Sequence, residues 1–138
     1  MWTIAQPTVS HESARWIYAN PNPEQKDVPD CVIRAICIAL NKPWEEVFWE
    51  LSHVAGDHHS ITSDDHIWGR YLWEFGFIPF KLPVSCPECV TIRDFAEIFN
   101  QGTYIVGTGY HAVALIDGNY YDTWDSGNEV AKFFWKIW

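Results

Sequence analysis

The stretch at residues 102–127, GTYIVGTGYHAVALIDGNYYDTWDSG, decides the fold of this chain. Its β-branched and aromatic residues come in short runs that glycines interrupt, which is typical of strands. Asp117 and Gly118 lie between two such runs, and this pair predicts a tight hairpin. A further run, KFFWKIW at residues 132–138, predicts another strand. We therefore expect the C-terminal third to form an antiparallel sheet.

The chain upstream of this stretch has a helical pattern. Apolar residues recur every three or four positions, which predicts helices at residues 31–40, 43–56, 64–76 and 92–100. Asp30, Ser63 and Thr91 have the residue types that favour N-caps before three of these helices. Helices followed by strands predict an α+β fold, with the N-terminal helices packed on one face of a C-terminal antiparallel sheet.

Length and composition indicate one folded domain. The chain has 138 residues, 48% of them hydrophobic and 17% aromatic, which is enough to bury a core. Residues 1–24 contain three prolines and no regular pattern, so we expect an N-terminal arm there and a single domain at residues 25–138.

Charge and hydropathy exclude several classes of partner. The net charge is −9 and no Lys/Arg cluster is present, which argues against nucleic acid. No apolar stretch is long enough to span a bilayer, so we expect no membrane partner. The first 16 residues lack the pattern of a signal peptide, which predicts a cytoplasmic protein, in a host cytoplasm if the gene is from a phage. There, all four cysteines are expected to be thiols.

Cys31 is the first candidate for chemistry, because it stands at the predicted start of the helix at 31–40. The helix dipole and free N–H groups at such a position lower the pKa of a thiol. The thiolate is the nucleophilic form. A lone cysteine at a helix start is more often a small buried side chain than a nucleophile, and Cys37 on the same helix is expected to be core.

His111 and Asp122 lie on the two strands of the predicted hairpin. His111 opens the strand HAVALIDG, and Asp122 returns beside it on the second strand, where a carboxylate could orient the imidazole ring. Asp125 is the alternative to Asp122, and Asn119 is a weaker one. Gln25, six residues before Cys31, could join the Cys31 backbone N–H in stabilising an oxyanion.

The order Gln25, Cys31, His111, Asp122 resembles that of papain-like cysteine peptidases. The segment QKDVPDC is similar to the start of bacteriocin-processing double-glycine peptidases, and DCVIRAI is similar to a segment of ovarian-tumour-type deubiquitinases. The block at residues 107–129 resembles one found in small papain-like proteins of bacteria and their phages. Val32 departs from the glycine that follows the cysteine in double-glycine peptidases.

The resemblance implies a minimal papain-like fold and a thiol hydrolase of peptide or isopeptide bonds that needs no cofactor. It assigns Cys31 as nucleophile, His111 as general base, Asp122 as orienting residue and Gln25 to the oxyanion hole. The expected partner is a peptide or protein substrate. Amidase and acyltransferase activity use the same triad and stay open.

Other residues around this set are candidates for binding. Trp124 is expected either in the core or as a wall of a substrate groove. Asp30 and Tyr110, the chain neighbours of Cys31 and His111, are further groove candidates.

Two different functions stay open as alternatives. One is a catalytically inactive papain-like module that binds a protein through the same groove. The other is a small structural-zinc protein that uses Cys86 and Cys89, which have the spacing of half a zinc site. The histidines and aspartates at residues 53–66 could also bind a metal, although a solvated loop with helix-capping carboxylates accounts for them better.

Overall fold

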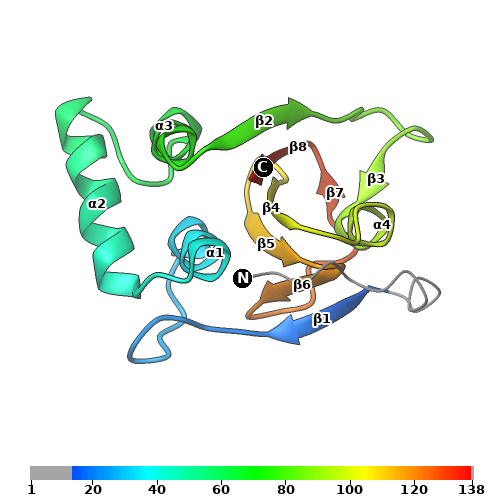
Figure 1. Ribbon diagram of the computed structural model, residues 1–138, viewed down its shortest axis with the longest axis horizontal. Coiled ribbons are helices and arrows are strands. Elements are labelled where there is room, and N and C mark those ends of the chain that lie inside the picture. The colour runs from blue at the N-terminus through cyan, green and yellow to red at the C-terminus, as the bar shows by residue number, and fades with distance from the viewer. Residues whose placement is uncertain (1–13, 138) are drawn as a thin grey trace.

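A mixed sheet of six strands forms the centre of the molecule (Figure 1). The computed structural model describes residues 14–137. Across the sheet the order is β1 (Arg15–Tyr18), β6 (Asn119–Asp122), β5 (Ala112–Ile116), β4 (Thr103–Gly107), β8 (Phe133–Ile137) and β2 (Phe77–Lys81). The predicted hairpin joins β5 to β6, and Asp117 and Gly118 in its turn both have positive φ. The strands predicted in the C-terminal third are therefore present.

Four helices precede or interrupt these strands: α1 (Cys31–Leu40), α2 (Trp44–Asp57), α3 (Asp65–Glu74) and α4 (Ile92–Ile98). Thr91 caps α4 in a reciprocal capping box, as its residue type predicts. Asp64, and not Ser63, is the N-cap of α3. A small second sheet pairs β3 (Val90–Thr91) with β7 (Val130–Ala131). The α+β class is confirmed.

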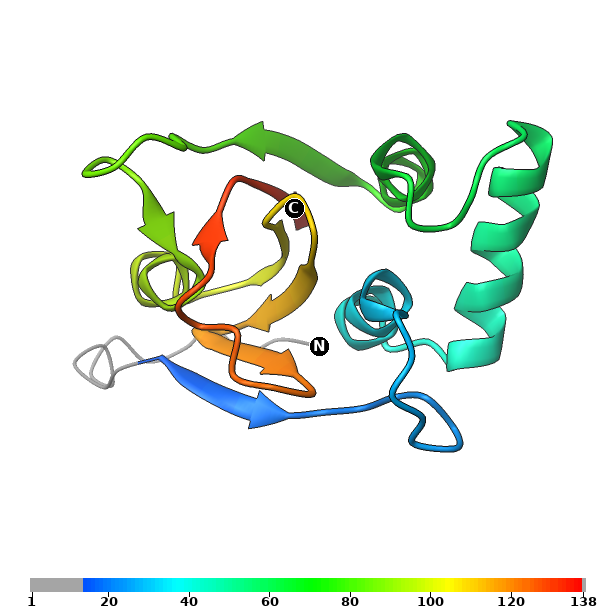
Figure 2. The ribbon, with the colours of Figure 1, turned by 180° about the vertical axis from the view of Figure 1, so that it is seen from behind.

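Two details of the sheet differ from the prediction. The sheet is not wholly antiparallel, because β1 runs parallel to β6. This edge strand comes from the segment predicted to be an arm, of which residues 1–13 lie outside the described part of the chain. Both β1 and β2, at opposite edges, extend the sheet beyond its C-terminal strands, as Figure 2 shows from behind.

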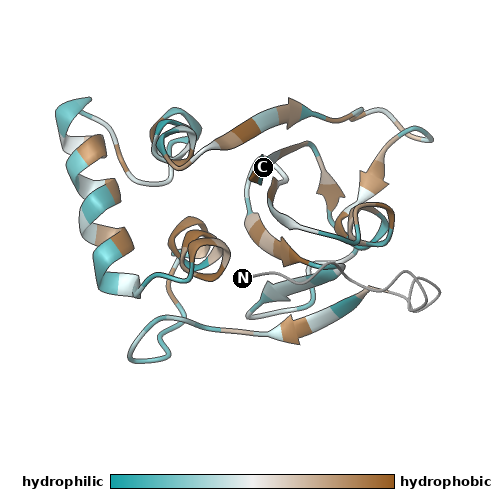
Figure 3. Cartoon of the chain, in the orientation of Figure 1, coloured by the Kyte–Doolittle hydropathy of each residue, from teal (hydrophilic) through white to brown (hydrophobic). Residues whose placement is uncertain are grey.

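Helices cover both faces of the sheet, and not one face as predicted. Alternate residues of a strand point to opposite faces. Ile105 and Ala114 pack with α1, α2 and α3, whereas Val106 and Val113 pack with α4 in a second core. Helix α1 is apolar along most of its length (Figure 3), because it lies between the sheet and α2.

The arrangement brings the start of α1 against the start of β5. Helix α1 is buried from Val32 to Cys37, so its position relative to the sheet is fixed by packing. Within residues 14–137, no helix has both the length and the apolar character needed to cross a bilayer.

Candidate active site

Cys31 is the first residue of α1, where the prediction placed it. Its side chain is partly buried and lies beside His111 and the backbone of Ala112. The first N–H groups of a helix have no acceptor within the helix, so they point at this position. Cys37 on the same helix is buried in the core, as expected, and burial raises the pKa of its thiol to about 12.

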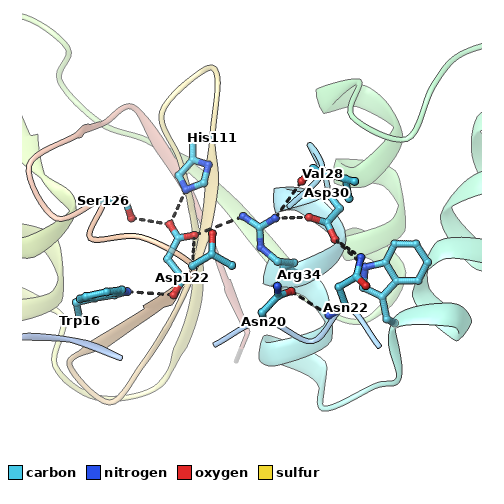
Figure 4. Close-up of polar contacts among 11 residues, drawn as sticks. Trp16, Asn20, Asn22, Val28, Asp30, Arg34, His111, Asp122 and Ser126 are labelled. Atoms are coloured by element: carbon cyan, nitrogen blue, oxygen red, sulfur yellow. Dashed lines mark hydrogen bonds and ion pairs between the residues drawn. The ribbon is translucent and has the colours of Figure 1, made fainter. Parts of the chain in front are cut away.

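His111 directly precedes β5, and Asp122 is the last residue of β6. Nε2 of His111 lies 2.5 Å from Oδ2 of Asp122 (Figure 4). The Asp122 carboxylate is 3% exposed and also accepts hydrogen bonds from the Ser126 hydroxyl at 2.7 Å and the Thr123 backbone N–H at 2.8 Å. These contacts fix the carboxylate, which in turn holds the imidazole with Nδ1 left for Cys31.

The alternative carboxylate, that of Asp125, contacts other residues and not His111. It accepts a hydrogen bond from the Tyr120 hydroxyl at 2.6 Å and pairs with Arg93 at 3.3 Å. Asn119 lies at the opposite end of β6, where it pairs with Ile116. The structure therefore brings Asp122, and neither of these two, to His111.

The pKa shifts of the Cys31–His111 pair favour the ionised form of both side chains. Burial opposes ionisation of Cys31, but His111, the Ala112 backbone and the charge of Arg34 outweigh it and hold the pKa of the thiol below its usual range. Burial likewise opposes protonation of His111, but Asp122 and Cys31 raise its pKa to about 9. Neighbouring opposite charges thus prevail over desolvation at both groups.

Arg34 and Asp30 complete a buried network that the sequence reasoning missed. Arg34 forms ion pairs with Asp30 and, at 3.5 Å, with Oδ1 of Asp122 (Figure 4). Asp30 accepts further hydrogen bonds from Trp44 at 2.9 Å and Asn22 at 3.3 Å. One signal was available in the sequence: Arg34 is a cation in an otherwise apolar helix, four residues after an aspartate.

The predicted role of Asp30 as a groove residue is wrong. Asp30 is 5% exposed, and its carboxylate bonds to the network and not to the first turn of α1, which it does not cap through its side chain. A buried carboxylate seeks a cation and N–H donors, which Arg34, Trp44 and Asn22 supply.

Gln25 does not point its amide at the candidate site in this structure. Its exposed side chain uses both N–H bonds for carbonyls of its own loop, those of Asn20 and Asn22, each at 2.9 Å. Of the two donors expected for an oxyanion, the backbone N–H of Cys31, at the first position of α1, is the one that this loop conformation does not remove.

A cavity of about 210 Å³ adjoins the pair. Six of the residues that line it are Cys31, His111, Tyr110, Ser63, Asp65 and Trp68. Tyr110 is 93% exposed at its rim, and the ring of Trp124 lies 5.0 Å from that of His111 with 44% of the residue exposed. A larger hollow of about 660 Å³ beside α3 contains neither Cys31 nor His111, so the smaller cavity fits the chemistry better.

The prediction of free thiols at Cys86 and Cys89 is wrong, because the two form a disulfide with Cα atoms 4.6 Å apart. A three-residue separation in a turn brings the two side chains within bonding reach. This pairing also removes them as candidate zinc ligands. Among the described residues, no group of three or more His, Cys, Asp or Glu side chains could hold a metal ion, including those at residues 53–66.

Comparison with models of known protein families, with curated proteins and with solved structures finds no match to this chain.

Proposed function

We propose that this protein is a cysteine hydrolase of peptide or isopeptide bonds, with Cys31 as nucleophile, His111 as general acid and base, and Asp122 as orienting residue. The observation that carries the proposal is the position of His111, which interacts with the Cys31 thiol on one side and with Asp122 at 2.5 Å on the other. A nucleophile, a base and a group that orients the base are the three parts that covalent hydrolysis requires.

In the proposed reaction, the Cys31 thiolate attacks the carbonyl carbon and the electrons of the C=O bond move to the oxygen. The Cys31 backbone N–H at the start of α1 stabilises that oxyanion. The C–N bond then breaks, the amine leaves with the proton of the His111 imidazolium, and a thioester remains. Water attacks the thioester while His111 takes its proton, and the acid leaves as the thiolate–imidazolium pair forms again.

The surroundings of the pair support this reaction over simple structural use of the cysteine. The cavity of about 210 Å³ gives a substrate group room beside the sulfur. The exposed rings of Tyr110 and Trp124 flank His111 and offer apolar contacts to a peptide chain. A resemblance to papain-like peptidases in residue order agrees with this assignment.

The test is hydrolysis of a peptide library and of isopeptide-linked proteins by the full chain, with products identified by mass spectrometry. We expect cleavage by wild type and by Cys37→Ala, and loss of at least about 1,000-fold in Cys31→Ala. Cys37 is the matched control, because it is a thiol on the same helix that lies in the core. Absence of products with wild type, or equal products with Cys31→Ala, would contradict the proposal. If wild type gives no products, a catalytically inactive module that binds a protein becomes the better hypothesis.

A further inference from the structure

Arg34 is the residue of α1 that connects the helical layer with the sheet by charge. It lies three residues after Cys31, is 7% exposed and forms ion pairs with Asp30, which directly precedes α1, and with Asp122 on β6. Its Nη1 also lies 3.5 Å from the carbonyl oxygen of Val28. In Figure 4 the guanidinium lies between the two carboxylates, and His111 contacts the other oxygen of the Asp122 carboxylate.

A buried guanidinium needs an explanation, because apolar residues of similar volume commonly stabilise a core as well or better. Apart from Cys31, every other residue of α1 is uncharged, and the buried positions of the helix pack in the core with α2, α3 and the sheet. Packing therefore does not require a cation at position 34. What the cation contacts is the carboxylate that holds His111.

We propose that Arg34 is a positioning residue, which holds the Asp122 carboxylate in register with His111 and balances the negative charge beside Cys31. The two oxygens of Asp122 have separate partners: Oδ1 faces Arg34 and the Thr123 N–H, and Oδ2 faces His111 and Ser126. Arg34 thus fixes the rotation of the carboxylate through the oxygen that does not contact the imidazole.

The charges around the pair predict the direction in which the pKa values of Cys31 and His111 change when Arg34 is replaced. Asp30, Arg34 and Asp122 together carry one net negative charge, and the Cys31–His111 pair adds none in its ionised form. Without the guanidinium, two negative charges remain, which disfavours the thiolate and favours the imidazolium. Both protons should then leave at higher pH. Among the described residues, the other titratable side chains that line the cavity beside the pair are Asp65 from α3 and Tyr110 next to His111.

The experiment measures the rate of iodoacetamide alkylation of Cys31 in the full chain from pH 4 to 11 by mass spectrometry. The profile has an acidic limb, where Cys31 loses its proton, and a basic limb, where His111 loses its proton. In Arg34→Gln, we expect both limbs to move to higher pH, by about one pH unit. In Asp30→Asn, which removes a negative charge and keeps the shape of the side chain, both limbs should move down. Arg34→Lys should restore most of the shift of Arg34→Gln, and Arg93→Gln, which breaks a separate ion pair, should change neither limb.

If Arg34 had a purely structural role, Arg34→Gln would lower the stability of the fold and leave both limbs of the alkylation profile where they are. Unmoved limbs in folded Arg34→Gln, or in Asp30→Asn if the first variant does not fold, would overturn the proposal. The inference rests on the proposed Cys31–His111 pair, but its readout is thiol reactivity and not hydrolysis. Shifted limbs without any hydrolysis would support Arg34 and refute the hydrolase, and hydrolysis with unmoved limbs would do the reverse.

Discussion

Replacing Asp122 with asparagine tests the centre of the proposed site, because the change removes one charge and keeps the shape of the side chain. The pKa of His111 is raised to about 9, against about 6.5 for a free imidazole. At about 1.4 kcal/mol per unit, the folded protein favours the imidazolium by about 3 kcal/mol. Burial opposes this preference, and the largest contribution in its favour is the hydrogen bond to Asp122. We expect Asp122→Asn to lower the pKa of His111 by about 2 units.

The same shift predicts how stability depends on pH. The pKa of His111 is higher in the folded than in the unfolded chain, so its contribution to the free energy of unfolding is complete below about pH 6.5 and is lost as the pH rises through about 9. The pKa of Cys31 is lowered, so its contribution is also stabilising but has the opposite pH dependence: it is complete above the pKa of the unfolded thiol and is lost as the pH falls. The deficit in stability of Asp122→Asn should therefore be largest near pH 6 and shrink by up to about 3 kcal/mol above pH 9.

Two measurements check this prediction. Titration of the His111 ring protons by NMR, assigned by their loss in His111→Gln, gives the pKa directly, and urea unfolding at both pH values gives the stability difference. Asp125→Asn is the control, because Asp125 is three residues away but contacts Tyr120 and Arg93 instead of His111. The reasoning fails if His111 of the wild type titrates near pH 6.5, or if Asp125→Asn moves it as far as Asp122→Asn does.

Three further changes have definite expected results. Gln25→Ala should keep hydrolysis within about tenfold of wild type, because the amide binds its own loop, whereas loss of an oxyanion donor costs about 100-fold or more and would show that Gln25 moves into the site. Gly127→Ala should lower the free energy of unfolding by about 1–3 kcal/mol in urea, since its Cβ would lie 2.3 Å from the hydroxyl of buried Tyr120, and an unchanged midpoint would contradict that packing. Replacing Cys86 and Cys89 together with alanine should cost at most about 2 kcal/mol, because the closed loop is short, and should leave Cys31 alkylation unchanged, which the same mass spectrometry measures.

The parts of the fold that depend on residues close to one another in the chain could be predicted from the sequence. The helix at 31–40 has an apolar stripe, and the hairpin at Asp117 and Gly118 has a turn pair that tolerates positive φ. The pairing of β1 with β6, over 100 residues away in the chain, has no local signal. Nor does the position of α4, whose apolar side fits either face of a sheet equally well.

The residues of the site likewise divide into those with a local signal in the sequence and those that depend on distant contacts. Cys31, His111 and Asp122 could be chosen because each stands at the end of a predictable element, and such ends meet when the elements pack. The role of Gln25 is predicted from its spacing to Cys31 and from the resemblance, whereas the carbonyls that hold its amide depend on a loop conformation that neither determines. Arg34 was missed because its second partner, Asp122, is 88 residues away.

The cost of the buried network bears on the choice between hydrolase and binding module. Asp30, Arg34 and Asp122 are each less than 10% exposed, and removing one partner of such a network leaves an uncompensated charge. A module that only binds a partner needs a shaped surface and gains nothing from ionic groups beneath it. A thiolate–imidazolium pair does gain, because its two protons respond to every charge within a few ångströms. Strongly shifted groups beside a cavity are characteristic of reactive sites. The network therefore favours chemistry at Cys31, and the opposite shifts expected for Arg34→Gln and Asp30→Asn are the form in which that preference can be measured.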